Sequence, residues 1–206
     1  MNGFYRFILR GFSIFYPYKV YNRDNVPKGA AVFICNHFRA IDCAFVADVY
    51  CRDIFYLAKE EVFKNKLLAK IIKSLGGIPI NRDNPSISSI LKATKALKDG
   101  HKLAIFPEGT RNKSGTDQLQ EIKSGSGVFA VKAKVPILPI MLSGKARMFR
   151  RTKIYIGKPF ELSEYYDKKL TPEVISEIDG VIREKMLETQ IELKSVCNKK
   201  KKKCKS

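Results

Sequence analysis

The chain has 206 residues and a formal net charge of +19, and hydrophobic residues make up 45% of it. This length fits one domain with at most a short appended element, and the apolar fraction excludes a chain that is disordered throughout. No charge-free apolar run reaches the roughly 18 residues of a conventional membrane-spanning helix. The charge indicates an acidic partner: nucleic acid, anionic lipid, or an acidic protein or substrate.

Residues 1–24 are expected to form an amphipathic segment that lies in a membrane interface. Eight aromatic residues fall within this segment. On a helix, Phe4 and Phe12 would share one face while Arg10 lies on another, and Pro17 would end the helix. A short, basic, aromatic helix of this kind is typical of membrane-interface elements. A helix packed on the domain's own core is the alternative interpretation.

Strands alternating with helices are predicted over residues 25–194. Apolar runs predict the strands, and a 3.6-residue periodicity predicts the helices. The expected strands are 31–35, 54–58, 77–81, 102–106, 136–142 and 153–156, and the expected helices are 40–50, 62–75, 84–100, 126–134 and 171–193. This alternation predicts an α/β domain with a mostly parallel central sheet flanked by helices.

Local signals refine several of these elements. Asn84 and Thr171 are expected N-caps, because each is followed by a proline at the first helical position. The strand at 136–142 contains two prolines, which cannot donate ladder hydrogen bonds, so it should have unusual pairing or lie at a sheet edge. The late strand at 153–156 is also a candidate edge strand.

The C-terminal residues 195–206 are expected to be a disordered polybasic tail. Residues 194–206 contain seven lysines and no acidic residue. Like charges in such a block repel one another. The tail could act by keeping the protein soluble or by contacting an anionic membrane or an acidic partner.

Cysteine and histidine usage argues against a bound metal. The chain has five cysteines and two histidines, and none of the cysteines forms a C-x-x-C pair. We therefore expect no zinc site. The odd number of cysteines favours reduced thiols in a cytosolic compartment.

A histidine and an aspartate follow the first predicted strand of the domain. Asn36, His37 and Asp42 belong to the sequence N-H-F-R-A-I-D. Histidine suits proton transfer near neutral pH, and a carboxylate on its other ring nitrogen would hold its tautomer. The spacing allows contact only if His37 lies in the turn and Asp42 on the next helix. From these residues alone, a catalytic and a structural histidine are equally supported.

Two further polar turns follow later strands. Arg82 stands after the strand at 77–81, where a guanidinium suits bidentate phosphate binding, although a surface ion pair is the simpler interpretation in isolation. Residues 106–111 read F-P-E-G-T-R, a turn richer in polar groups than an ordinary connection. Ligands in such sheets bind beyond the carboxyl ends of the strands, so these turns are candidate parts of one site.

Taken in order, these blocks resemble the glycerophosphate acyltransferase family of the bacterial PlsC type, the 1-acyl-glycerol-3-phosphate acyltransferases. The resemblance covers about residues 25–160 and rests on four motifs in order. The matching blocks are N-H-x-x-x-x-D at Asn36, His37 and Asp42, G-x-I-x-x-x-R ending at Arg82, F-P-E-G-T-R at 106–111 and V-P-I-x-P at 135–139.

The resemblance implies transfer of a fatty acyl group from a thioester to the sn-2 hydroxyl of lysophosphatidic acid, giving phosphatidic acid. The thioester would be acyl-acyl-carrier protein or acyl-CoA as co-substrate, with no cofactor and no metal. His37 would be the general base and Asp42 the group that orients it. Cys35, near His37, reads as a core residue of the buried strand, so direct transfer is expected.

The resemblance also implies a phosphate-binding set. Arg82 and Arg111 would hold the phosphate of the acceptor. Gly109 and Thr110 would supply backbone and hydroxyl donors. Glu108 would receive a glycerol hydroxyl or orient one of the two arginines.

Partners and location follow from the charge together with the resemblance. An anionic membrane surface is the expected partner, and the protein is expected at the cytoplasmic face of the cell membrane as a peripheral enzyme. Alternatives are an acyltransferase for glycerol-3-phosphate or another lysophospholipid, or a non-catalytic basic protein that binds membranes or nucleic acid. No nucleic-acid-binding motif is recognised in the sequence.

Overall fold

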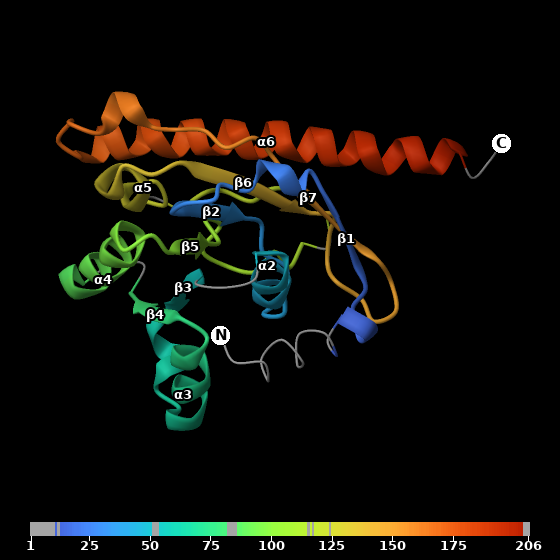
Figure 1. The fold of residues 1–206 in the computed structure, drawn as a ribbon, viewed down its shortest axis with the longest axis horizontal. Coiled ribbons are helices and arrows are strands. Elements are labelled where there is room, and N and C mark those ends of the chain that lie inside the picture. The colour runs from blue at the N-terminus through green and yellow to red at the C-terminus, as the bar shows by residue number, and fades with distance from the viewer. Residues whose placement is uncertain are drawn as a thin grey trace.

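A seven-stranded sheet forms the centre of the fold, in the order β1-β7-β6-β2-β5-β3-β4 (Figure 1). The computed structural model describes residues 11, 13–50, 54–81, 86–114, 116, 118–123 and 125–203. The strands are β1 (Tyr18–Tyr21), β2 (Ala31–Cys35), β3 (Ile54–Lys59), β4 (Gly77–Ile80), β5 (Lys102–Ile105), β6 (Ile137–Leu142) and β7 (Thr152–Ile156). The α-helices are α2 (Asp42–Tyr50), α3 (Lys66–Ser74), α4 (Ile87–Lys98), α5 (Val128–Ala133) and α6 (Pro172–Lys203). The predicted α/β architecture with a mostly parallel sheet is confirmed.

The sheet changes direction at β6. Strands β2 to β6 run parallel to one another, whereas β7 is antiparallel to β6 and β1 is parallel to β7. The proline-containing strand therefore lies inside the sheet between β7 and β2, so the edge position, one of the two predicted alternatives, is wrong. Pro139 lies opposite Ile34, and its carbonyl accepts a hydrogen bond from the Gly157 N–H at 2.9 Å.

The prediction of an edge position for the late strand is wrong, because β1 covers β7. Tyr18 to Tyr21 pair with Thr152 to Tyr155 in register. These four residues fall within the range 1–24 that was expected to lie in a membrane interface. The sequence pattern missed β1 because its side chains are mostly half-buried, as an edge strand allows.

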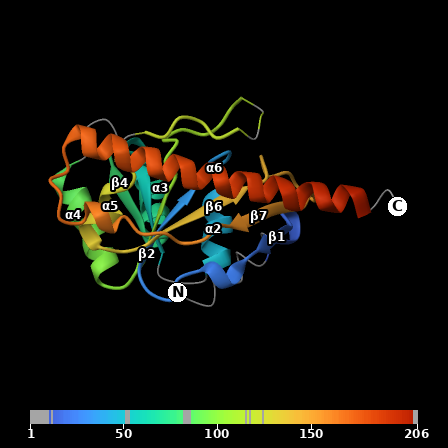
Figure 2. The same cartoon turned by 90° about the horizontal axis from the view of Figure 1, so that it is seen from above.

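Both faces of the sheet are covered, and β2 shows why. All five of its residues are buried, as expected for a parallel strand between two helical layers. Phe33 belongs to the apolar cluster that includes Phe45 of α2. Val32 belongs to the opposite cluster, which includes Ile178 and Ile182 of α6. Figure 1 shows α6 above the sheet and α2 below it, and Figure 2 shows α6 crossing the sheet.

Two helix boundaries differ from the predicted ones. α4 begins at Ile87 with Ser86 as its N-cap, whose hydroxyl accepts from the Ser89 N–H at 3.3 Å, so the predicted cap at Asn84 is wrong; residues 82–85 lie outside the described residues. The predicted helix at 62–75 is divided into a 3₁₀ turn at Glu60–Phe63 and α3.

The C-terminal helix is longer than expected. Thr171 caps it as predicted, accepting from the Val174 N–H at 3.4 Å, with Pro172 as the first helical residue. The helix continues past Leu193 to Lys203. Residues 195–203, which were expected to be disordered, therefore extend α6.

The predicted N-terminal amphipathic helix lies mainly outside the described residues, which omit 1–10 and 12. Residues 13–15 are helical, and the helix ends before Pro17 as expected. Within the described part of the chain, no helix combines the length and the apolar character that a membrane crossing requires.

Gly127 allows α5 and α6 to approach each other closely. A Cβ atom built on Gly127 would lie 2.3 Å from Ile178 Cγ2 and 2.9 Å from Ile182 Cδ1. We expect Gly127→Ala to lower the free energy of unfolding by about 1–3 kcal/mol, because overpacking must displace one helix. Chemical denaturation measures this change.

The matched control is Gly180→Ala, in the middle of α6. A Cβ atom there would meet nothing within 4 Å, so this change should raise the free energy of unfolding by about 0.5–1 kcal/mol through helix propensity. Equal effects of the two substitutions would contradict the close-approach interpretation.

Candidate active site

Two loops that follow adjacent strands meet at one edge of the sheet. Residues 36–41 follow β2, and residues 106–127 follow β5, its parallel neighbour. Parallel strands bring their carboxyl ends to the same edge, where Figure 2 shows the long yellow-green loop extending past the sheet. The loops are joined directly, because the Asn112 N–H donates to the His37 carbonyl at 2.7 Å.

The Asp42 carboxylate organises the first loop. Its Oδ2 accepts from the backbone N–H groups of Phe38 at 2.6 Å and Arg39 at 2.7 Å. The same oxygen lies 3.2 Å from Nδ1 of His37. Asp42 is the first residue of α2, so the five-residue spacing is bridged by a turn followed by a helix start, the geometry that the spacing requires. The other oxygen, Oδ1, has no hydrogen-bond partner among the described residues.

The His37 ring is held between a carboxylate and an aromatic ring. It stacks on Phe106 with ring centroids 4.1 Å apart and an interplanar angle of 25°. The His37 side chain is 12% exposed and that of Asp42 is 0% exposed. A largely buried imidazole with one nitrogen on a carboxylate leaves its second nitrogen as the atom that can exchange a proton.

Glu108 joins the two loops through hydrogen bonds to their backbone. Its Oε1 accepts from the His37 N–H at 2.9 Å and its Oε2 from the Gln120 N–H at 3.2 Å. Burial raises the pKa of Glu108, and the two backbone hydrogen bonds oppose that rise. Each Glu108 oxygen thus accepts one backbone hydrogen bond, and the expected roles of Glu108, receiving a glycerol hydroxyl or orienting Arg82 or Arg111, stay predictions.

The last three residues of the F-P-E-G-T-R turn are half-buried or exposed. Gly109 has a φ of +68°, a left-handed conformation that favours glycine, and it packs against the side chain of Lys123. Thr110 is exposed, and its hydroxyl lies 3.5 Å from Oε1 of Gln120. Arg111 is also exposed.

Of the two arginines predicted to bind phosphate, the structure describes Arg111 but not Arg82. Arg111 directly precedes Asn112, whose N–H donates to the His37 carbonyl at 2.7 Å, so its backbone lies beside the histidine loop. Arg82 lies outside the described residues, and its place in the site stays a prediction. The neighbouring β4 ends at Ile80, at the same edge of the sheet.

Two asparagine side chains stabilise the loops of the site, Asn36 in the histidine loop and Asn112 in the loop after β5, and these roles were not predicted. Asn36 forms a paired contact with the end of β6: its Oδ1 accepts from the Leu142 N–H at 2.8 Å and its Nδ2 donates to the Leu142 carbonyl at 3.1 Å. The Asn112 side chain donates to the Gln118 carbonyl at 2.9 Å. A polar residue directly after a fully buried strand was the signal that could have identified Asn36.

Helix α6 holds the second loop, which no sequence motif indicated. Arg183 donates to the Gln120 carbonyl at 3.1 Å, so the Gln120 residue is fixed by Arg183 on one side and by Glu108 on the other. Asp179 accepts from the Gly125 N–H at 2.9 Å and from the Ser126 hydroxyl at 3.2 Å. The packing of α6 on the sheet therefore positions the loop that carries Glu108.

An apolar cavity of about 400 Å³ opens beside the site. Leu57 of β3, Ile90 of α4 and Phe129 of α5 line it, with Lys123 at its polar side. Phe106 lines the same cavity and stacks on His37. Phe106 therefore borders both the cavity and the His37 ring.

The two cysteines beside the site are poor thiolate formers. Burial raises the pKa of Cys43 to about 12. Burial also raises the pKa of Cys35 well above its usual value, and the charges of Asp42 and Glu108 add to this effect. Within the described residues, no group of three or more His, Cys, Asp or Glu side chains is arranged to hold a metal ion.

Known proteins match both the sequence and the fold of the chain. Residues 17–143 match the family described as "Acyltransferase". The 1-acyl-sn-glycerol-3-phosphate acyltransferase of Bacillus subtilis (strain 168) is 32% identical over 154 residues, covering 71% of this chain and 75% of that protein. The protein of the same name from Streptococcus pneumoniae is 30% identical over 156 residues, covering 73% of this chain and 56% of that protein.

A crystal structure of the 1-acyl-sn-glycerophosphate (LPA) acyltransferase PlsC from Thermotoga maritima has the same fold. Its TM-score is 0.64 at 21% sequence identity, covering 92% of this chain and 81% of that chain. The family match spans more than half of the chain and includes both loops of the site. The chain therefore belongs to the acyltransferase family.

Proposed function

We propose that this chain transfers a fatty acyl group from a thioester to the sn-2 hydroxyl of 1-acyl-sn-glycerol-3-phosphate, giving phosphatidic acid. The observation that carries the proposal is the His37–Asp42 pair, with Nδ1 3.2 Å from Oδ2, at the end of β2. The names of the B. subtilis and S. pneumoniae relatives support this substrate class.

In the proposed reaction His37 is the general base. Its Nδ1 faces Asp42, so Nε2 accepts the hydroxyl proton while the hydroxyl oxygen attacks the thioester carbonyl. The new C–O bond forms in a tetrahedral intermediate, which then collapses with cleavage of the C–S bond. The imidazolium returns its proton to the thiolate that leaves, and Asp42 stabilises the imidazolium in between.

The acceptor phosphate is assigned to the loop after β5 and to Arg82. Arg111 offers an exposed guanidinium near the catalytic pair, and guanidinium groups bind phosphate oxygens in a bidentate manner. Gly109 and Thr110 precede it in the same turn and offer a backbone N–H and a hydroxyl. Glu108 contributes indirectly, because its hydrogen bonds to His37 and Gln120 set the position of the turn.

The proposal also covers the acyl donor, the binding place of its hydrocarbon chain and the location of the enzyme. The donor is an acyl thioester of acyl carrier protein or of coenzyme A. The apolar cavity that Phe106 borders is suited to a hydrocarbon chain, because its walls are mostly aliphatic and aromatic. Because the acceptor is a lipid, we place the enzyme on the cytoplasmic face of the cell membrane as a peripheral protein.

The decisive assay incubates purified protein with 1-acyl-sn-glycerol-3-phosphate and either acyl-CoA or acyl-acyl-carrier protein, and measures phosphatidic acid by mass spectrometry. His37→Ala should lower the rate by about 10²–10⁴-fold, because the hydroxyl loses its base. Glycerol-3-phosphate and other lysophospholipids are tested in parallel as acceptors.

The matched control for His37 is His101→Ala, since the chain has two histidines. His101 follows α4 and contacts the Phe55 ring at a centroid distance of 5.3 Å. His101→Ala should retain turnover. Normal turnover by folded His37→Ala would remove the proposed base, and absence of product with every acceptor would reject the proposed activity.

Removal of a phosphate ligand should act mainly on acceptor binding. We expect Arg111→Ala and Arg82→Ala each to raise the KM for lysophosphatidic acid by roughly 10- to 100-fold, the loss typical of a hydrogen bond to a charged group. Lys113→Ala, an exposed cation in the same loop, is the control and should leave KM unchanged. A KM unaffected by an arginine substitution would exclude that arginine from the phosphate site.

Direct transfer requires no thiol nucleophile. Since the pKa of Cys43 is about 12, its thiolate is scarce near pH 8 and increases only as the pH rises towards that value. Cys43→Ala should therefore retain turnover, and iodoacetamide should label native Cys43 far more slowly than the unfolded chain at pH 8. An acylated Cys43 detected during turnover would overturn direct transfer.

A further inference from the structure

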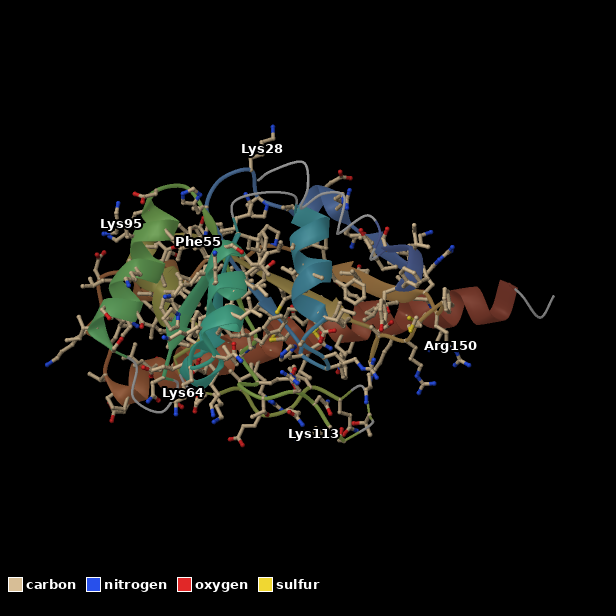
Figure 3. All side chains as sticks on the ribbon, turned by 90° about the horizontal axis from the view of Figure 1, so that it is seen from below. Lys28, Phe55, Lys64, Lys95, Lys113 and Arg150 are labelled. Carbon is tan, nitrogen blue, oxygen red and sulfur yellow. The ribbon has the colours of Figure 1, made fainter. Side chains whose placement is uncertain are left out.

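Large exposed apolar side chains gather on the side of the molecule that faces away from α6. We call this side the basal face and define it by residues from three elements. Figure 1 shows these elements below the sheet, and Figure 3 shows the molecule from that side with α6 behind. The residues are Ile14 and Phe15 before β1, Leu67, Leu68, Ile71 and Leu75 on and just after α3, and Met148 and Phe149 between β6 and β7.

Helix α3 has more apolar surface than the domain covers. At about 100° per residue, its apolar residues span half of the helix circumference. Ala69 is buried against the domain and Ile72 is half-buried beside it. Leu67, which is 71% exposed, and Ile71 point away from that contact. A helix that only covered the sheet edge would carry polar residues at these positions.

The connection between β6 and β7 presents a second apolar projection. Arg147 and Arg150 pair as an isolated antiparallel bridge, which places Met148 and Phe149 at the tip of a tight turn. Phe149 is 70% exposed and has a φ of +57°. A bulky aromatic residue in the left-handed region is strained, and such strain is typical of functional positions.

This tip contacts the end of the N-terminal segment. The Phe149 N–H donates to the Phe15 carbonyl at 2.7 Å, and the two rings have centroids 6.0 Å apart. The preceding Ile14 is also exposed. The Met148–Phe149 tip therefore forms one apolar patch with Ile14 and Phe15.

Both apolar projections are surrounded by positive charge. From Lys64 to Leu75, and again from Ser143 to Arg151, the sequence contains no acidic residue. The preceding Glu61 is paired with Lys59 at 2.7 Å. Figure 3 labels Lys64 near α3 and Arg150 beyond α2, on the two sides of the basal face. The exposed cations of these stretches are Lys64, Lys66, Lys70, Lys73, Lys145, Arg147, Arg150 and Arg151.

We infer that the basal face binds an anionic lipid bilayer, with α3 and the Met148–Phe149 tip as its contacts. Apolar side chains rimmed by lysine and arginine match the apolar interior and acidic headgroups of such a surface. α2, whose first residue is Asp42, lies on the same side of the sheet as this face. Vesicle binding is measured without substrate and does not depend on the proposed reaction.

The test measures binding of the full chain to phosphatidylglycerol–phosphatidylcholine vesicles by sedimentation. Leu67→Ser/Ile71→Ser and Met148→Ser/Phe149→Asn should each lower the partition coefficient by about tenfold, the loss expected for two apolar side chains that insert partly. Asparagine is chosen because it tolerates the left-handed conformation. High salt should weaken binding of the unaltered chain.

The matched control is Leu187→Ser/Ile191→Ser, with the same spacing of four residues. Ile191 is 68% exposed on α6, on the opposite side of the molecule, so this pair should bind as the unaltered chain does. If both basal pairs bind like the unaltered chain, or if the α6 pair loses binding instead, the basal face is not the lipid contact.

A second measurement uses single substitutions, so it tests the proposal even if a double variant is unstable. The chain contains no tryptophan, so Leu67→Trp, Phe149→Trp and Ile191→Trp each carry a single fluorescent indole. Vesicles should shift the emission of the first two to shorter wavelength, because the indole enters an apolar environment, and should leave Ile191→Trp unchanged. Unshifted emission at both basal positions would overturn the proposal.

Discussion

The buried carboxylate of Asp42 is the interaction on which the site depends. A carboxylate removed from water needs hydrogen-bond donors, and Asp42 obtains them from the Phe38 and Arg39 N–H groups and from His37. Those donors can reach one oxygen only if the chain turns sharply between β2 and α2. The same contact therefore shapes the loop, begins the helix and orients the imidazole, so a single residue couples local structure to chemistry.

A second layer of contacts fixes this loop in the molecule. Glu108 ties the His37 backbone to Gln120, Asn36 ties the end of β2 to the end of β6, and Arg183 of α6 holds the far side of Gln120. The first two contacts attach the histidine loop to other elements, and the third attaches α6 to the loop that carries Glu108. Rigid positioning of this kind matters for a base that must meet a hydroxyl in one geometry, and it explains why α6 packs along the sheet beside the site.

The net charge of +19 can be assigned to separate regions of the structure. Part of it lies on α3 and on the connection between β6 and β7, next to exposed apolar side chains. The remainder includes Arg111 in the candidate phosphate site and the lysines at the end of α6. Cations placed beside apolar groups suit a charged surface with an apolar interior, whereas a nucleic-acid partner would provide no place for Leu67 or Phe149.

The sequence by itself determined the strands and most helices of the parallel part of the sheet, the order of the motifs, and the His37–Asp42 spacing. These features depend on local periodicity, capping and turn chemistry, which are set by residues close together in the sequence. Only the tertiary structure decided that β1 joins the sheet, that β6 lies inside it, and that Glu108 binds backbone. The Asn36–Leu142 contact spans 106 residues and the Gln120–Arg183 contact spans 63. Such partners are selected by the strand order, which results from burying the whole chain at once, so no local pattern contains them.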